Sequence, residues 1–298
     1  MSRRFELTDE EWELIHPLLP PDTPQRGGRW RDHRQVLNGI IYRTRTGIPW
    51  RDLPERYGPW STVHQRLLRW EADGTWARIE EHLIDTQDDT DLHAQIDSTV
   101  VRAHQHAAGA RKGGAAPRTH EPPQHLGKSR GGLSTKIHTV CEGTGNPLAT
   151  ILTPGQGADT LQLPVLVGLV RVKRPGPGRP RTRLDSLAGD KAYSSTANRS
   201  ILRSKGIGCT IPEREDQKAN RRNRGSAGGR PPSFDRQAYR RRNRVERLMN
   251  RRKQFRALAT RYDKLATSYR ATVRIADILI RLRARPDKTT PQDPPNTP

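Results

Sequence analysis

Three segments in the first third of the chain place hydrophobic residues at the spacing of amphipathic helices. Thr8 begins a capping-box pattern ahead of the segment EWELI. Asp32 is placed to cap HRQVLNGIIYRTRT, which Gly47 ends, and Ser61 is placed to cap TVHQRLLRWEAD, which Gly74 ends. The pattern therefore predicts three helices with defined starts and stops.

The last two of these helices flank GIPWRDLPERYGPW, whose Pro and Gly residues leave room for at most one short helix. A helix, a short turn element and a second helix form a helix-turn-helix-like layout, so we expect a small all-α domain over residues 1–90. Its last helix would present His64, Arg66 and Arg69 to DNA. All six tryptophans lie in this region, so the alternative is a Trp-rich packing domain whose helices contact only protein.

The hydrophobic pattern changes from residue 92, where strands and helices alternate over a predicted second domain, 91–285. Strands are expected within 93–103, 134–142, 147–155, 183–193 and 207–212. Helices are expected within 161–172, 194–206, 235–262 and 267–283. Polar segments 104–131 and 213–233 are predicted loops, and 286–298 a disordered tail. Three strands followed by helix, strand, helix, strand and helix is the element order of the α/β ribonuclease H-like fold, with a mixed five-stranded sheet. Order alone does not decide the fold, because other α/β domains share parts of it.

Charge divides the chain in the same place. Residues 1–90 hold 13 basic and 16 acidic residues, whereas 91–298 hold 41 and 16, within a total net charge of +22. Such a basic region favours nucleic acid as the partner over a membrane surface or a merely soluble basic protein. No long apolar run or leader pattern is present, so we expect a cytoplasmic protein without a membrane partner. Cys141 and Cys209 are interpreted as buried thiols.

Two aspartates stand out in the predicted strands. Asp97 lies in the β-branched run QIDSTVV, where a carboxylate is unfavourable by propensity and costly if it is buried unpaired. Asp190 follows LAG, where the fourth strand ends, and Asp185 is its rival from the same segment. An aspartate after glycine is also ordinary turn chemistry, so the interpretation of Asp190 as a functional residue needs further support.

The segment YRRRNRVERLMNRRKQ holds seven arginines and one lysine but a single acid, Glu246. At about 100° per residue, Tyr239, Arg242, Glu246 and Lys253 share one face of a helix. Arginines off that face, among them Arg244 and Arg247, are free to meet phosphate. The plain interpretation is a charged surface helix in which Arg242 and Glu246 form an i,i+4 ion pair. The functional interpretation makes Glu246 a metal ligand in a basic DNA channel.

The spacing Y-x2-R-x3-E-x6-K resembles the sequence around the last catalytic glutamate of bacterial insertion-sequence transposases of the DDE type, most closely the insertion sequence five family. RTGIPWRDLP and GPWSTVHQRLLRW resemble the family's N-terminal domain, and IDSTVVRAHQHAAG and LAGDKAYSS resemble the segments around its two aspartates. The resemblance covers nearly the whole chain. Departures are few: Arg244 stands where an apolar residue is more usual, and GQGAD falls where the family varies.

The resemblance implies that Asp97, Asp190 and Glu246 are catalytic and hold two Mg²⁺ ions, with Mn²⁺ as the substitute metal. It implies cleavage of insertion-element ends and transfer of the freed 3′-hydroxyl into target DNA. Arg242 and Lys253 would position phosphates, and Tyr239 would contact the active strand. Implied partners are double-stranded DNA, as terminal inverted repeats and target, and a second copy of the chain in a homodimer on DNA near the nucleoid. The alternatives are a catalytically inactive DNA-binding regulator derived from a transposase and a nuclease without joining activity.

Overall fold

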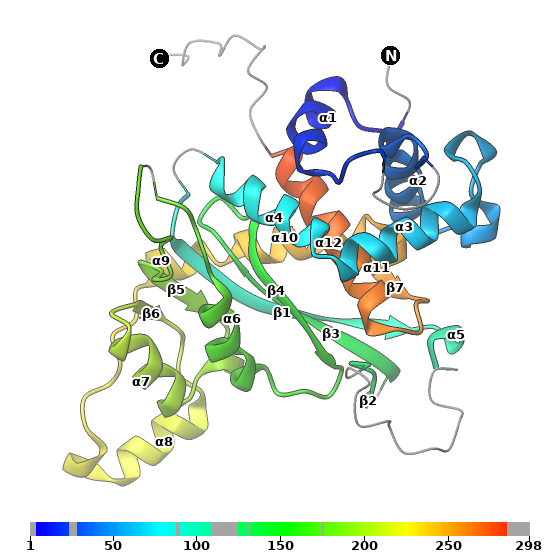
Figure 1. Ribbon diagram of the computed structural model, residues 1–298. Coiled ribbons are helices and arrows are strands. Elements are labelled where there is room, and N and C mark those ends of the chain that lie inside the picture. The colour runs from blue at the N-terminus through cyan, green and yellow to red at the C-terminus, as the bar shows by residue number, and fades with distance from the viewer. Residues whose placement is uncertain are drawn as a thin grey trace, which may run out of the picture.

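A mixed sheet with a helical layer on each face organises the computed structural model of the chain (Figure 1). The structure describes residues 4–23, 29–87, 90–108, 124–129, 131–174 and 176–284. Most of the predicted loop 104–131 and the predicted tail 286–298 lie outside these residues. None of the helices within these ranges is long and apolar enough to cross a membrane.

Four helices form the N-terminal part: α1 (Asp9–Ile15), α2 (His33–Thr46), α3 (Trp60–Ala72) and α4 (Thr75–Asp85). The predicted caps of the first two are present. Thr8 and Glu11 form the reciprocal capping box, and the Asp32 side chain accepts a hydrogen bond from the Gln35 amide. Gly47 ends α2 in the left-handed conformation, with φ at 71°. The GIPWRDLPERYGPW segment contains two short 3₁₀ turns, Trp50–Asp52 and Glu55–Tyr57.

Two details of this part differ from the prediction. Helix α3 begins at Trp60 with Pro59 as its N-cap, so Ser61 lies inside the helix rather than capping it. A fourth helix, α4, follows directly because Gly74 adopts a left-handed conformation that turns the chain between α3 and α4. Its apolar face contacts a helix some 200 residues later in the chain, which the local pattern does not reveal.

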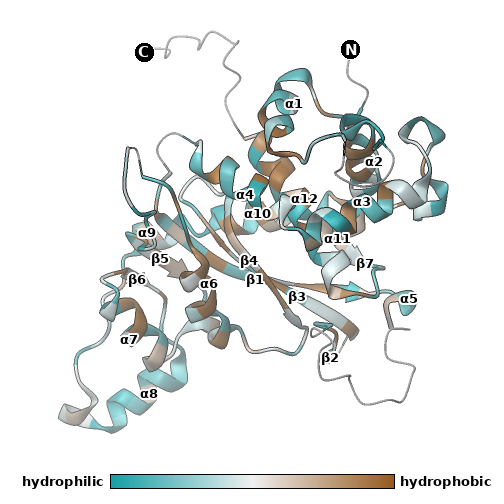
Figure 2. Ribbon diagram, in the orientation of Figure 1, coloured by the Kyte–Doolittle hydropathy of each residue, from teal (hydrophilic) through white to brown (hydrophobic). Residues whose placement is uncertain are grey.

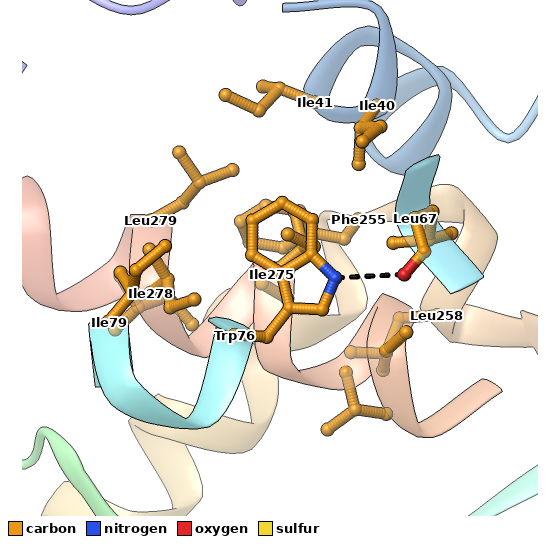
Figure 3. Packing of buried hydrophobic residues seen from close by; sticks show 14 of the residues in the cluster. Ile40, Ile41, Leu67, Trp76, Ile79, Phe255, Leu258, Ile275, Ile278 and Leu279 are labelled. Carbon is orange, nitrogen blue, oxygen red and sulfur yellow. Dashed lines mark hydrogen bonds between the residues drawn. The ribbon is translucent and has the colours of Figure 1, made fainter. Parts of the chain in front are cut away.

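That contact places the N-terminal helices and the C-terminal helices in one hydrophobic core (Figure 3). Trp76 of α4 is buried beside Ile275 and Leu279, which belong to α12 (Ala266–Leu282). Its indole N–H donates a 3.0 Å hydrogen bond to the Leu67 carbonyl of α3. The division predicted at residue 90 therefore separates two sequence units that share a core.

Five strands form the body of the sheet: β1 (His93–Ala103), β3 (Gly132–Cys141), β4 (Pro147–Pro154), β5 (Ser186–Gly189) and β6 (Gly208–Thr210). Their order is β4-β3-β1-β5-β6, antiparallel across β4, β3 and β1 and parallel across β1, β5 and β6. Two short strands pair with the ends of inner strands: β2 (Gly127–Ser129) with the start of β3, and β7 (Thr260–Arg261) with the last two residues of β1. This order and these directions are those of the predicted ribonuclease H-like fold.

Helices of the second part lie on both faces of this sheet. They are α5 (Gln105–Ala108), α6 (Leu163–Leu169), α7 (Thr196–Ser204), α8 (Glu215–Asn223), α9 (Arg236–Arg240), α10 (Asn243–Lys253), α11 (Arg256–Ala259) and α12. A second hydrophobic core joins α6 and α7 to β1, β5 and β6, on the sheet face opposite the first core. Ser195 caps α7, since its side chain accepts a hydrogen bond from the Asn198 amide.

Three predictions for this part are wrong. The predicted loop 104–131 contains α5 and β2 in its described residues. The single helix expected over 235–262 is three helices, because the chain turns at Arg241 and again at Phe255, whose extended backbone carries its side chain into the core. The predicted loop 213–233 contains α8. Acidic residues in the first turn of α8 and arginines in its last turn suit the helix dipole, but the surrounding Gly and Pro residues concealed this helix.

Candidate active site

The two aspartates singled out in the sequence lie side by side on neighbouring parallel strands, Asp97 within β1 and Asp190 directly after β5. Strands β1 and β5 pair with Ile96 opposite Gly189, so Asp97 and Asp190 are the next residue along each chain. Both side chains accept a hydrogen bond from the amide of the following residue. Asp185 lies just before β5, at its other end, and pairs with Arg181 at 2.9 Å. Of the two acids around β5, the structure therefore brings Asp190 to Asp97.

Glu246 reaches the same region from α10, which lies against β1. The guanidinium of Arg242 links it to the first aspartate, because one amino group donates to Asp97 Oδ2 at 3.2 Å and the other donates to Glu246 Oε1. The i,i+4 ion pair considered in the sequence is thus present. It is also extended by a contact to a residue 145 positions earlier in the chain, which a simple surface helix does not require.

The pKa of Asp97 reflects its burial and its closeness to the other two acids. Burial raises the pKa of Asp97, and repulsion from Asp190 and Glu246 raises it further. The Ser98 amide and the positive charge of Arg242 act in the opposite direction. Three carboxylates around one guanidinium leave an excess of negative charge, which a cation would relieve.

Carboxylate oxygens are the ligands that Mg²⁺ and Mn²⁺ prefer, so the donor chemistry of these three acids fits a divalent cation. Their present arrangement does not, since in the described ranges no three His, Cys, Asp or Glu side chains are grouped closely enough to hold an ion. The side chain between Asp97 and Glu246 is Arg242, which is only 18% exposed. Arg242 therefore occupies one carboxylate oxygen of Asp97 and one of Glu246.

A polar network on the opposite face of β1 was missed in the sequence. Ser98 donates to Asp159 Oδ1 at 2.9 Å, and Lys136 donates to the same oxygen at 3.0 Å. Burial lowers the pKa of nearby His138 to about 4, so this histidine is neutral at pH 7. Burial also raises the pKa of Tyr193, which carries its hydroxyl into the same region. Two features of the sequence indicated this network: the acid in GQGAD, and the position of Ser98 next to Asp97 in a strand, which places the two side chains on opposite faces of the sheet.

The other residues of the Tyr-Arg-Glu-Lys spacing surround the carboxylates less closely. Tyr239 lies on α9 rather than on the helix of Glu246, and the Arg242 guanidinium lies 5.7 Å from its ring centre. Lys253 is the exposed last residue of α10. Arg247 is exposed, whereas Arg244 lies 3.8 Å from the carboxylate of Asp91. The helix break thus separates Tyr239 from the stripe in which it was predicted.

The three N-terminal residues predicted to contact DNA differ in exposure, from buried Arg66 through partly buried His64 to exposed Arg69. Arg66 is 6% exposed, hydrogen-bonded to His33 and positioned over the Trp30 ring at 4.3 Å. His64 packs on Trp50 with ring centres 4.8 Å apart. Arg69 is exposed. A shallow hollow of about 310 Å³ on this surface is lined by Arg29, Trp30, Arg31, Thr62, Gln65, Arg66 and Arg69.

The strand order and the acids on β1, after β5 and on α10 define a ribonuclease H-like protein with an acidic candidate site. Family comparison makes the class specific. A model of the transposase DDE domain matches residues 89–278, and a model of transposases assigned to the IS4/5 family matches residues 7–80. The chain therefore belongs to the DDE transposases of bacterial insertion sequences.

Two curated relatives are similar to part of the chain. An uncharacterized Sinorhizobium fredii protein, y4sN, is 43% identical over 115 residues, which are 38% of this chain and 90% of the relative. A 16.2 kDa protein of insertion element IS402 from Burkholderia cepacia is 38% identical over 126 residues, 39% of this chain and 84% of the relative. Among solved structures, the Mos1 strand transfer complex aligns with 88% of this chain and 66% of its own chain, at 12% identity and a TM-score of 0.24.

Proposed function

We propose that this transposase cleaves DNA at the ends of its insertion element and joins the freed 3′-hydroxyl to target DNA. The observation that carries the proposal is the convergence of Asp97 and Asp190 on adjacent parallel strands, with Glu246 linked to Asp97 through Arg242. Acids that are few in a strongly basic region and come from three distant segments are better explained by a shared ligand than by stability, because burial already penalises the charge on Asp97.

In this proposal Asp97, Asp190 and Glu246 hold two Mg²⁺ ions, or Mn²⁺ ions. When bound, such a pair of ions would stabilise the charge on the attacking and leaving oxygens of the phosphodiester. Arg242 would then have a second role. Once cations take over its role of neutralising the carboxylates, its guanidinium is free to bind a phosphate of the DNA strand at the site.

Double-stranded DNA would contact the exposed basic residues around this centre, with Lys253, Arg244 and Arg247 along α10 and Tyr239 beside Arg242. In the N-terminal part, Arg69 rather than the buried Arg66 or the packed His64 would contact the element end. Two ends must be held together during transposition, so we infer that a homodimer acts on DNA.

The decisive variant is Glu246→Gln, which keeps the shape of the side chain and removes its charge. It should abolish Mg²⁺-dependent cleavage of end-bearing DNA and leave end binding within a few-fold of the wild type. Asp185→Asn is the matched control, because Asp185 flanks the same strand as Asp190 but pairs with Arg181 at the far end. Cleavage by Glu246→Gln, or equal losses in both variants, would contradict the assignment.

A DNA-binding regulator without catalytic activity is the second candidate. One observation favours it: Arg242 neutralises two of the three acids, and no ion site is preformed among the described residues. Incubation of the wild-type protein with end-bearing DNA, with Mg²⁺ or with EDTA, separates the two functions. Metal-dependent nicks and strand-transfer products support the transposase, nicks alone indicate a nuclease, and binding without nicks supports the regulator.

A further inference from the structure

A second basic surface lies beyond the candidate active site, where α7, α8 and the segment 229–233 meet. Two adjoining hollows, of about 790 and 510 Å³, share Arg199, Arg203, Arg230 and Pro232 in their linings. We call them together the α7–α8 groove. Figure 1 shows α7 and α8 at the β6 side of the molecule, away from the N-terminal helices, and Figure 2 shows α8 as mostly hydrophilic. Residues 191–233 hold ten basic and three acidic residues.

The arginines of the α7–α8 groove are of two kinds. Arg199 is fixed, since it donates to the Ser194 hydroxyl and to the Ile211 carbonyl at 3.1 and 2.7 Å, and Arg221 is fixed by Glu213. Three others are exposed and form no hydrogen bond or ion pair through their side chains within the part of the chain that the structure describes. These are Arg203, Arg224 and Arg230. Fold stability therefore does not account for them.

The groove is tied to the segment that carries Asp190. Ser194 donates to Gln217 Oε1 of α8 at 2.7 Å, and the Gln217 amide nitrogen donates back to the Ser194 carbonyl at 2.9 Å. Ser194 lies four residues after Asp190, and the groove lining begins at Ser195 and Thr196. A polyanion held in the groove would therefore have a fixed position relative to the carboxylates.

We propose that the α7–α8 groove binds the phosphate backbone of duplex DNA without reading its sequence, and so holds either the target DNA or the DNA that flanks the element. The proposal rests on the proposed function above and extends it. Arginines from three separate segments line the groove, which suits an extended chain of phosphates better than a single anion. Contacts to phosphate position a duplex but carry no sequence information, which suits target and flanking DNA because both vary in sequence.

Two double variants of the full chain test the groove. Arg203→Ala with Arg224→Ala removes two unpaired groove arginines. Lys205→Ala with Arg222→Ala removes two exposed charges from the same ends of α7 and α8 but outside the lining. The affinity of each variant for a random-sequence duplex is measured in EDTA between about 50 and 200 mM salt. Each lost phosphate contact lowers the steepness of log affinity against log salt by about 0.9. The slope of the groove variant should therefore be shallower than that of the control variant by about 2. Equal slopes in the two variants, both on random-sequence duplex and on end-bearing duplexes that keep flanking sequence, would overturn the proposal.

The choice of DNA distinguishes the two sources of phosphate. A defect on random-sequence duplex and in strand transfer assigns the groove to target DNA. A defect confined to end-bearing duplexes that keep flanking sequence assigns it to the flank. Binding measured in EDTA does not depend on DNA cleavage. If the wild-type protein fails to cleave DNA while the two variants still differ in binding, the proposed function is refuted and the proposal for the groove stands. Thermal unfolding checks that both variants are folded.

Discussion

Replacing Arg252 with methionine tests how α10 is held against the sheet. Arg252 and its partner Asp277 of α12 are both fully buried, and their side chains form two parallel hydrogen bonds of 2.7 and 2.6 Å. The same guanidinium also donates to the hydroxyls of Thr139 on β3 and Thr150 on β4. One side chain therefore connects α10, α12 and two strands.

The expected cost follows from what the substitution leaves behind. Within the described part of the chain, Asp277 would keep only the 3.1 Å hydrogen bond from Thr150, with its charge still buried. Breaking a buried pair in this way costs about 3–5 kcal/mol, a large share of a total stability of roughly 5–15 kcal/mol. Removing both charges is expected to cost less than the sum of the single changes by on the order of 1–3 kcal/mol, because no unpaired charge remains.

Urea unfolding followed by tryptophan fluorescence measures these values, since Trp70 and Trp76 are buried in the core that α12 completes. The set comprises Arg252→Met, Asp277→Leu and the double variant. Arg214→Met is the control, because it breaks an ion pair whose partners are 51% and 60% exposed and should cost about 0–1 kcal/mol. A loss for Arg252→Met no larger than that for Arg214→Met, or strictly additive single losses, would refute this reasoning.

Two further substitutions probe partly buried acids. Burial, and then repulsion from Asp277, raises the pKa of Glu80 in the folded protein to about 7. Protonation of Glu80 therefore stabilises the folded state. This contribution is fully present below the pKa of Glu80 in the unfolded chain and is lost as the pH rises through about 7. Glu80→Gln should therefore show a smaller loss of unfolding free energy between about pH 5 and pH 8 than the wild type, and an unchanged loss would contradict this. Asp159→Asn weakens the contacts of the carboxylate with Lys136 and Ser98 and should cost about 1–2 kcal/mol; urea unfolding with no loss would exclude a supporting role for this network.

Elements whose start and stop are written in nearby residues were predictable. Asp32 and Gly47 bound α2 as expected, and β1 spans 93–103 as expected, because cap chemistry and β-branched alternation are local signals. Helix α4 and the break at Phe255 were not predictable in this way. Both depend on side chains that enter a core assembled from the two ends of the chain, and tertiary packing of this kind overrides local propensity.

The candidate site shows the same division. Asp97 and Asp190 could be selected because each is an acid at a strand position, but their proximity depends on the parallel pairing of β1 with β5. Arg66 was expected at a DNA surface because helical spacing placed it there. It is instead buried by His33 and Trp30, which lie more than 30 residues away, and sequence spacing within one helix gives no information on such neighbours.

The basic segment 239–254, which runs from α9 to the end of α10, uses several of its arginines to contact protein. Arg242 binds the candidate catalytic carboxylates, Arg252 is buried on Asp277, and Arg251 donates to the Gly145 carbonyl. Three of the seven arginines in YRRRNRVERLMNRRKQ are therefore committed to protein, and Glu246 lies next to the first of them. A count of basic residues consequently overstates the DNA contacts this segment makes. The arginines left for phosphate are Arg240, Arg241 and Arg247, with Arg244 partly exposed at 3.8 Å from Asp91. Arg242 links the lone glutamate, whose side chain is 47% exposed, to Asp97.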